Sequence, residues 1–457
     1  MTVDTTIADL LACPRCDKAL THHAETGIHC SACQLTFPDL DGVPVLAADP
    51  TTTLGEWRQR HHMLLEKLAR EQHTLDAELA DKSLPELTRK RLTHLAEAKA
   101  KHVGELKVLL QPLELTGYQA SYDTYLALRT RLPSDHGLNT YYPNIHRDWA
   151  WGDDENQRST DLVMAALEGV DDGPQLVLGA GAGRLAYDLA LGQTGTPTIA
   201  LDFNPMLLLV AAAVCRGDSV TLTEFPIAPK RLQDIAVTRE LRAPTPASDN
   251  LQLIMADALR PPFKPQAFGT VITPWLVDVI PEPLDQFAAR INQLLPKGGR
   301  WVIFGSLAFG QSRQRDQLAF EEVESVLTEA GFVDIAINEA QIPYMCSPSS
   351  RHGRQEQVVI IRSTKAKTTK RPPRAVSLPD WIVKGDSPVP LSESFQTQAA
   401  STRIYAFLMS LIDGKRSLKD MAQLVEQQQL MSATEAESSI RSFLIKMYED
   451  SQRETTY

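Results

Sequence analysis

The chain has 457 residues, of which 43% are hydrophobic and 23% are charged. Such a composition is typical of a globular protein, and the length exceeds what one ordinary core supports, so two or three domains are expected. The net charge of −11 argues against a protein that binds nucleic acid over its whole surface, although this charge is compatible with a local basic patch.

The N-terminal sequence MTVDTTIADLLACPRC lacks a basic flank followed by a long apolar stretch, so we expect no signal peptide. No window approaches about 18 uninterrupted apolar residues, so no membrane span is expected either. Four of the six cysteines lie within the first 33 residues. Without a secretion signal, this distribution favours metal ligation over disulfides and predicts a cytoplasmic protein.

Two CxxC pairs, separated by thirteen residues, lie near the start of the chain. Each pair offers two thiolates from one tight turn, and together they make the tetrahedral sulfur set that zinc prefers. A redox CxxC is usually single and accompanies a βαβ pattern, which does not follow here. The predicted zinc ligands are Cys13, Cys16, Cys30 and Cys33.

Residues 1–48, including LLACPRC, GIHCSACQLTF and the closing DGVPVL, resemble the small zinc-ribbon proteins that act as activating partners of RNA and release-factor methyltransferases. The resemblance implies a zinc ion with a structural or docking role rather than a catalytic one.

Residues 49–117 carry apolar residues at roughly helical spacing, which predicts a helical hairpin with a packing role. Ser83 and Pro85 fit an N-cap and a first-turn break between its two helices. The rest of the chain is expected to hold an α/β domain, a basic Pro-containing linker and a small helical domain, at residues 118–363, 364–380 and 381–457.

The stretch from Gln175 to Asp202 follows the pattern strand, glycine turn, helix, strand, acid. The alternate glycines Gly179, Gly181 and Gly183 let the backbone turn tightly and approach a ligand where a Cβ would collide. An acid at the tip of the second strand can accept hydrogen bonds from a ribose diol. The pattern therefore predicts a nucleoside cofactor.

The loop sequence GAGAGR differs from two other types of nucleotide-binding loop. It is not a Walker loop, because no Lys-Ser or Lys-Thr follows the last glycine, and it lacks two residues that a dinucleotide fingerprint places between its second and third glycines. Alternate glycines suit an uncharged or zwitterionic ligand, and S-adenosylmethionine fits. Asp257, at the end of another predicted strand, can accept the adenine amine.

Four motifs resemble those of the carnosine N-methyltransferase family: NIHRDW at 144–149, LGAGAGRL at 178–185, VITPWLVD at 271–278 and WVIFGSL at 301–307. The resemblance implies a class I Rossmann-like fold that transfers methyl from S-adenosylmethionine to an imidazole nitrogen. The glycine pattern indicates Gly181 and Gly183 as cofactor contacts, and the resemblance adds Asn144, Arg147, Gly179, Asp202, Asp257 and Pro274. Of these, Asn144 takes the place of a family glutamine, Asp202 that of a glutamate and Pro274 that of a cysteine.

On the acceptor side, Asp278 matches a family aspartate that faces the imidazole, and Tyr344 matches a family tyrosine of the acceptor pocket. A carboxylate bonded to the ring N–H would fix the tautomer and stabilise developing positive charge. Alternatively, Asp278 caps a nearby helix. Gly310 stands where the family has an active-site histidine, and paired family tyrosines are missing near His352, so carnosine itself is in doubt as the substrate.

Residues 392–448 resemble the helical modules of the PqqD type, which bind peptides, but a winged helix or a three-helix bundle has similar features. The function predicted is N-methylation of a histidine-like nitrogen in a small molecule, peptide or protein. A non-catalytic adaptor is the alternative outside enzymes. An RNA methyltransferase is the alternative within them, although the acidic charge and the absence of an Asn-Pro-Pro-Tyr type motif weigh against it.

Overall fold

The computed structural model describes residues 8–23, 27–113, 138–170, 173–193, 195–309, 314–372 and 388–454. It divides into two compact units, Met1–Leu378 and Pro379–Tyr457. Among the described residues, no helix combines the length and the apolar character that crossing a bilayer requires. The predicted boundary at residues 117 and 118 lies outside the described residues.

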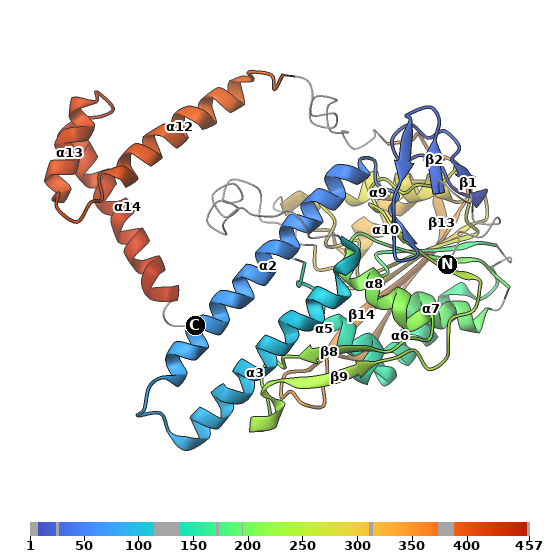
Figure 1. The fold of residues 1–457 in the computed structure, drawn as a ribbon. Helices are drawn as coiled ribbons and strands as arrows, with labels where there is room; N and C mark the ends of the chain where they lie inside the picture. Colours follow the sequence, from blue (N-terminus) through green and yellow to red (C-terminus); the bar gives the residue numbers. More distant parts are fainter. Residues whose placement is uncertain are drawn as a thin grey trace. The chain divides into compact units, whose positions relative to one another are not determined.

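A seven-stranded sheet forms the centre of the first unit (Figure 1), in the order β10-β7-β6-β11-β12-β14-β13. The five strands from β10 to β12 pair in parallel, whereas β14 runs antiparallel to both of its neighbours. This arrangement confirms the predicted Rossmann-like α/β fold. The strands are β6 Gln175–Leu178, β7 Thr198–Asp202, β10 Leu251–Met255, β11 Thr270–Pro274, β12 Arg300–Gly305, β13 Phe332–Tyr344 and β14 Arg354–Lys365.

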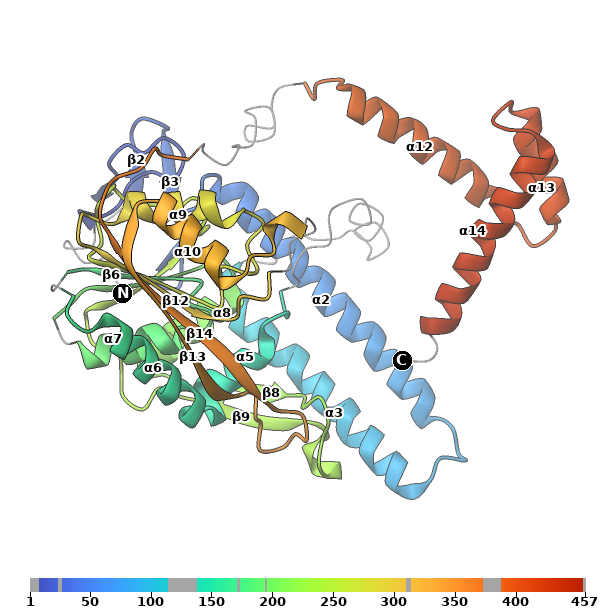
Figure 2. The same ribbon diagram turned by 180° about the vertical axis from the view of Figure 1, so that it is seen from behind.

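Helices cover both faces of this sheet, as Figures 1 and 2 show. Successive side chains of a strand point to opposite faces, so Val177 enters one apolar core while Leu176 and Leu178 enter the other. The first core includes α6, α7 and α8, and the second includes α9 and α10. These helices are α6 Asp153–Leu167, α7 Arg184–Gly192, α8 Pro205–Cys215, α9 Leu284–Leu294 and α10 Phe320–Glu329.

The predicted helical hairpin consists of α2 (Pro50–Leu79) and α3 (Glu86–Leu109). Near the start of α2, Trp57 is buried in the same core as α6, α7 and α8, whereas Leu75 of α2 packs with Leu92 of α3 in a small separate core. The prediction that Ser83 is an N-cap is wrong, because its N–H and hydroxyl donate to Asp81 at 2.8 and 2.7 Å. The short Asx turn satisfies Ser83 locally, and α3 starts without a side-chain cap.

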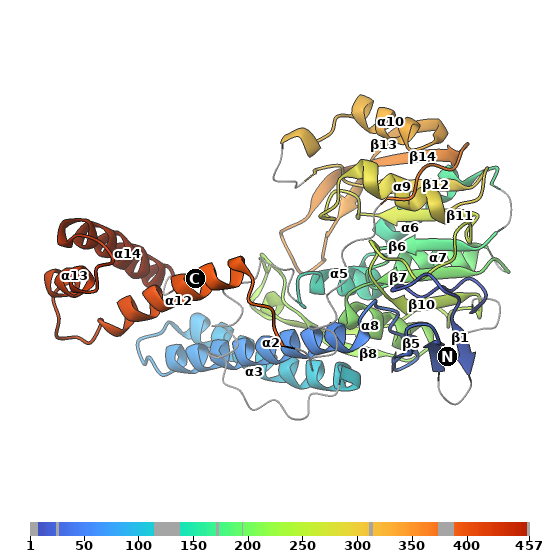
Figure 3. The same ribbon diagram turned by 90° about the horizontal axis from the view of Figure 1, so that it is seen from above.

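The N-terminal segment folds into a three-stranded sheet, β1 (Thr21–His23), β2 (Gly27–Cys30) and β3 (Leu35–Phe37), and a hairpin, β4 (Asp39–Leu40) and β5 (Val43–Pro44). Directly after β5, the N–H of Leu46 donates to the carbonyl oxygen of Met255 at 2.8 Å, and Val45 pairs with the same residue. Figure 3 shows β5 beside β10. The segment therefore packs against the edge of the central sheet.

A second hairpin and several short helices complete the first unit. Its strand β8 packs along α3, and both lie on the side of the sheet that carries α8. The elements are β8 Val220–Glu224, β9 Val237–Leu241, α5 Tyr142–His146, and the single-turn helices η1 Gln111–Leu113, η2 Arg147–Trp151, η3 Leu232–Ile235 and η4 Gln314–Asp316.

The basic stretch predicted as a linker begins inside the sheet. Strand β14 continues to Lys365, which is buried, and its Nζ donates to the carbonyl oxygens of Asn292 and Leu295 at 2.6 and 2.7 Å. Those carbonyls lie at the C-terminal end of α9, where unpaired acceptors and the helix dipole favour a cation. The linker prediction missed this, because composition alone does not reveal a partner for a lysine.

The second unit consists of α12 (Glu393–Ser410), α13 (Leu418–Gln427) and α14 (Ala433–Glu454), and residues 388–454 show no strand. Ser417 caps α13, and the N–H of Ser417 donates to the Asp420 carboxylate at 2.8 Å in a capping box. Apolar side chains from the three helices form its core: Leu411, Met421, Ala422, Val425, Ala436 and Ile440.

Candidate functional site

A cavity of about 430 Å³ opens where the C-terminal ends of β6, β7, β10 and β11 meet. Its volume falls in the range of small-molecule sites, roughly 300–1,000 Å³. In a sheet of this kind, ligands bind at this end of the strands. The predicted site residues that line it are Asn144, Arg147, Gly179, Gly181, Asp202, Asp257, Pro274, Asp278 and Tyr344.

The glycine turn after β6 is built as predicted. Gly179 and Gly181 have φ values of +73° and +59°, which favour glycine. No atom lies within 4 Å of the position that a Cβ of Gly181 would take, so the backbone there leaves open space beside the cavity. Gly183 does not line the cavity, because its Cβ position faces Ala211 of α8 at 3.1 Å. The turn can thus hold a ligand close to its first two glycines.

Asp202 is oriented by backbone amides at the end of β7. Its carboxylate accepts hydrogen bonds from the N–H groups of Gly181 and Asn204, both at 2.8 Å. Burial raises the pKa of Asp202 to about 6 although these amides lower it. Asp257 accepts from the N–H of Leu259 at 2.8 Å, and burial raises its pKa too. Two fixed carboxylates therefore face the cavity where ribose and adenine were predicted.

Arg147 belongs to a buried charge cluster at the wall of the cavity. Its guanidinium donates to Asp148 at 2.7 Å and to Glu155 at 3.2 Å, and Glu155 also accepts from the N–H of Met345 at 2.8 Å. Burial alone lowers the pKa of Arg147, but the two carboxylates outweigh it and raise the pKa above its usual range. The arginine is thus charged and held in one orientation.

Asp278 lies in the same cavity with one carboxylate oxygen unsatisfied. The side chain is 8% exposed, and its Oδ1 atom has no hydrogen-bond partner among the described residues. Burial raises the pKa of Asp278, although a hydrogen bond with Ser306 lowers it. It does not cap the following helix, because α9 begins after Pro283 without a side-chain cap. A buried acceptor without a partner is costly, which indicates a ligand that donates to it.

Aromatic rings form one side of the cavity near Asp278. The ring centroid of Trp275 lies 4.9 Å from that of Tyr344 and 6.1 Å from that of Phe304. Trp275 itself has a φ of +50°. A Cβ at Gly305, whose φ is +125°, would lie 2.8 Å from the Trp275 side chain, so only glycine leaves room for this ring.

Residues outside the predicted set also line the cavity, among them Trp57, Arg60, Tyr141 and Glu155. Burial and then the charges of Asp202, Tyr344 and Asp278 raise the pKa of Tyr141. Among the described residues no histidine lines the cavity, and position 310 is outside them. Any acid or base of the described cavity is therefore a carboxyl or phenol group.

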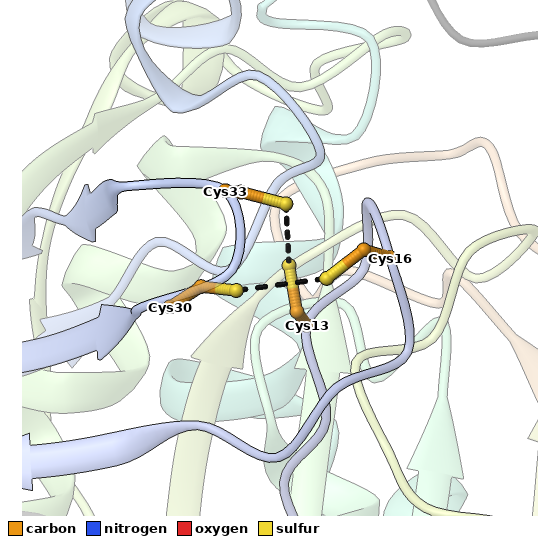
Figure 4. Close-up of side chains that lie close together, drawn as sticks. All are labelled: Cys13, Cys16, Cys30 and Cys33. Carbon is orange, nitrogen blue, oxygen red and sulfur yellow. Dashed lines mark hydrogen bonds between the residues drawn. The ribbon is translucent and has the colours of Figure 1, made fainter.

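The four N-terminal cysteines form a separate cluster (Figure 4) in which the Sγ atoms lie within 4.8 Å of one another. Cys13 and Cys33 are 4.0 Å apart, and Cys16 and Cys30 are 3.6 Å apart. Tetrahedral zinc with Zn–S bonds of about 2.3 Å requires sulfur pairs about 3.8 Å apart. The cluster fits zinc, and none of the four cysteines lines the large cavity.

The sheet order, the glycine turn and the carboxylates at the strand ends agree with the family comparison. Residues 138–359 match the model of the carnosine N-methyltransferase family. The matched methyltransferase domain contains the glycine turn, Asp202, Asp257, Asp278 and Tyr344. The chain thus holds an S-adenosylmethionine-dependent methyltransferase domain.

The N-terminal segment of the chain belongs to the UPF0434 family. It is 44% identical over 55 residues to a UPF0434 protein of Methylibium petroleiphilum, which corresponds to 12% of this chain and 85% of the relative. The segment contains the cysteine cluster, so the zinc ribbon is fused to the methyltransferase domain in one chain.

Two solved structures of methyltransferases are similar to parts of the chain. Phosphoethanolamine N-methyltransferase 2 of Haemonchus contortus is 13% identical with a TM-score of 0.32, and the match covers 51% of this chain and 60% of that chain. The N-methyltransferase NodS of Bradyrhizobium japonicum is 15% identical with a TM-score of 0.32, and the match covers 48% of this chain and 99% of that one.

Proposed function

We propose that this protein transfers a methyl group to a nitrogen of an imidazole or a similar ring in a small molecule, peptide or protein. The observation that carries the proposal is the Asp278 carboxylate, which is buried in the cavity and has an Oδ1 atom without a partner among the described residues. A neutral imidazole offers one N–H donor for this oxygen and one lone pair for the methyl group.

The residues around the cavity can orient such an acceptor. S-adenosylmethionine supplies an electrophilic methyl group when it is bound. Asp278 accepts the hydrogen bond of the ring N–H, which leaves the lone pair of the other ring nitrogen free to form the new N–C bond. As that bond forms, the ring gains positive charge, which the Asp278 carboxylate stabilises. The same carboxylate can then accept the proton of the ring N–H. The faces of Trp275 and Tyr344 favour the same cation.

The open cavity supports an enzyme over a non-catalytic adaptor. An adaptor has no need of a cavity of about 430 Å³ that places a buried carboxylate with one unpartnered oxygen beside aromatic rings. The site also holds two fixed carboxylates, Asp202 and Asp257, at the end predicted for the donor. Together these groups support donor and acceptor sites in one cavity.

The test is a methylation assay with labelled S-adenosylmethionine and a panel of imidazoles: carnosine, histidine, histamine and a histidine-containing peptide. Phenylalanine-containing analogues serve as controls for the ring nitrogen. We expect label in at least one imidazole compound, with the methyl group placed on a ring nitrogen by mass spectrometry. Label only in RNA, or only in amines without a ring nitrogen, would refute the proposal.

Substitution of Asp278 tests its role. We expect Asp278→Asn to bind S-adenosylhomocysteine normally and to lose about 100-fold or more in turnover, because the amide cannot stabilise the ring cation as the carboxylate does. Asp285→Asn, in the exposed first turn of α9, is the matched control and should retain turnover. Full turnover of Asp278→Asn would remove this residue from the mechanism.

A further inference from the structure

Helix α2 contributes side chains to the cavity although it lies outside residues 138–359. Trp57 and Arg60, which are three residues apart and so on one face of the helix, both line the cavity. Trp57 is 3% exposed, and its ring centroid lies 5.4 Å from that of Phe203. Phe203 directly follows Asp202, the acid at the predicted ribose position.

We propose that α2 forms the adenosine-facing wall of the methyl-donor site, with Trp57 as a binding residue. With the ribose bound at Asp202, the adjacent Phe203 ring, which lines the same cavity, is available to the adenine. Phe203 is 40% exposed and lines the cavity, while Trp57 packs against it at an interplanar angle of 60°. The two rings make an apolar corner, which suits the flat face of adenine.

Arg60 and Glu56 hold the Trp57 ring in this position. The guanidinium carbon of Arg60 lies 4.5 Å from the Trp57 ring centroid, and the Arg60 guanidinium pairs with Glu56 at 3.9 Å. The arginine side chain is 14% exposed, so the contact is largely shielded from water. Trp57 is therefore fixed between a cation and the Phe203 ring, and this preorganisation reduces the entropy lost on binding.

Contacts on both sides of Trp57 fix the start of α2 relative to the sheet. Asp49 caps the helix by accepting from the N–H of Thr52 at 3.3 Å, and three residues earlier Leu46 bonds to Met255 of β10. Arg58, next to Trp57, donates from Nε to the carbonyl oxygen of Leu113 at 2.6 Å. The zinc ribbon thereby helps to fix the position of Trp57 beside Phe203, directly after β7.

The inference concerns the donor alone, so it goes beyond the proposed function and does not depend on the acceptor. The experiment measures binding of S-adenosylhomocysteine and of 5′-methylthioadenosine to the full chain by titration calorimetry at pH 7. Both ligands contain adenosine, and the second lacks the amino-acid end. We expect Trp57→Ala to weaken both ligands equally, by about tenfold or more, and Trp57→Phe to weaken them less.

The matched control is Leu68→Ala, which removes another buried side chain of α2 that does not line the cavity. We expect it to lower the Tm while both ligands bind within twofold of the wild type, taken as roughly the precision of such comparisons. Normal binding by Trp57→Ala, or an equal loss in Leu68→Ala, would overturn the role of Trp57. A Trp57→Ala variant that loses affinity for only the amino-acid-bearing ligand would overturn the adenosine assignment.

Discussion

Donor binding should depend on pH through Asp202. Burial raises its pKa to about 6, and its carboxylate is the group predicted to accept the ribose hydroxyls. A carboxyl with this pKa is roughly nine-tenths ionised at pH 7 and one-tenth ionised at pH 5. Protonation removes an acceptor for two hydroxyl donors, so only the ionised form binds well. The Kd of the donor should therefore rise about tenfold as the pH falls from 7 to 5.

Titration calorimetry with S-adenosylhomocysteine at intervals between pH 5 and pH 7 measures this dependence, and circular dichroism at each pH excludes unfolding. Asp202→Asn should bind more weakly, with a smaller dependence on pH. Asp257, whose pKa is also raised by burial, is tested by Asp257→Asn, which should keep the step near pH 6. A constant Kd in the wild type, or the full step in Asp202→Asn, would refute the reasoning.

Two further predictions concern the aromatic wall and the metal. Gly305→Ala forces a Cβ to within 2.8 Å of the Trp275 side chain, so acceptor kcat/KM should fall about 10- to 100-fold. Gly331→Ala is the control: Gly331 has a φ of +93°, and a Cβ there would lie 2.6 Å from the Lys367 carbonyl oxygen. This variant should lower the Tm and leave kcat/KM unchanged. Equal kinetics of the two variants would contradict the prediction. Removal of zinc, by chelation or in Cys30→Ser, should lower both the Tm and the affinity for S-adenosylhomocysteine. If metal analysis confirms that the zinc is lost and the Tm is unchanged, the zinc is not structural.

The residues at strand ends could be predicted from the sequence. Asp202 is the last residue of one short apolar strand and Asp257 follows another. Parallel strands of one sheet end at the same edge, so the convergence of the two acids follows from the topology. The glycine turn was predictable because its alternate glycines demand a backbone that other residues avoid.

The contributions of α2 and of Lys365 could not be predicted in the same way. The apolar spacing of α2 predicts a helix with a buried face, but it does not reveal that Trp57 meets Phe203, which is far away in the sequence. Lys365 lies in a basic stretch whose composition is typical of a linker, and only the fold supplies the carbonyl oxygens that satisfy it. Local pattern predicts elements, whereas such contacts depend on how the elements pack.

The pairing of Leu46 with Met255 has a consequence for how the protein behaves in solution. Strand β10 is the last strand at its end of the sheet, and all five of its residues are buried. An apolar edge strand with free N–H and C=O groups is a template for edge-to-edge aggregation between chains. By covering the end of this strand, the ribbon protects it from such pairing. We expect a chain shortened to begin after residue 48 to expose this end of β10 and to self-associate.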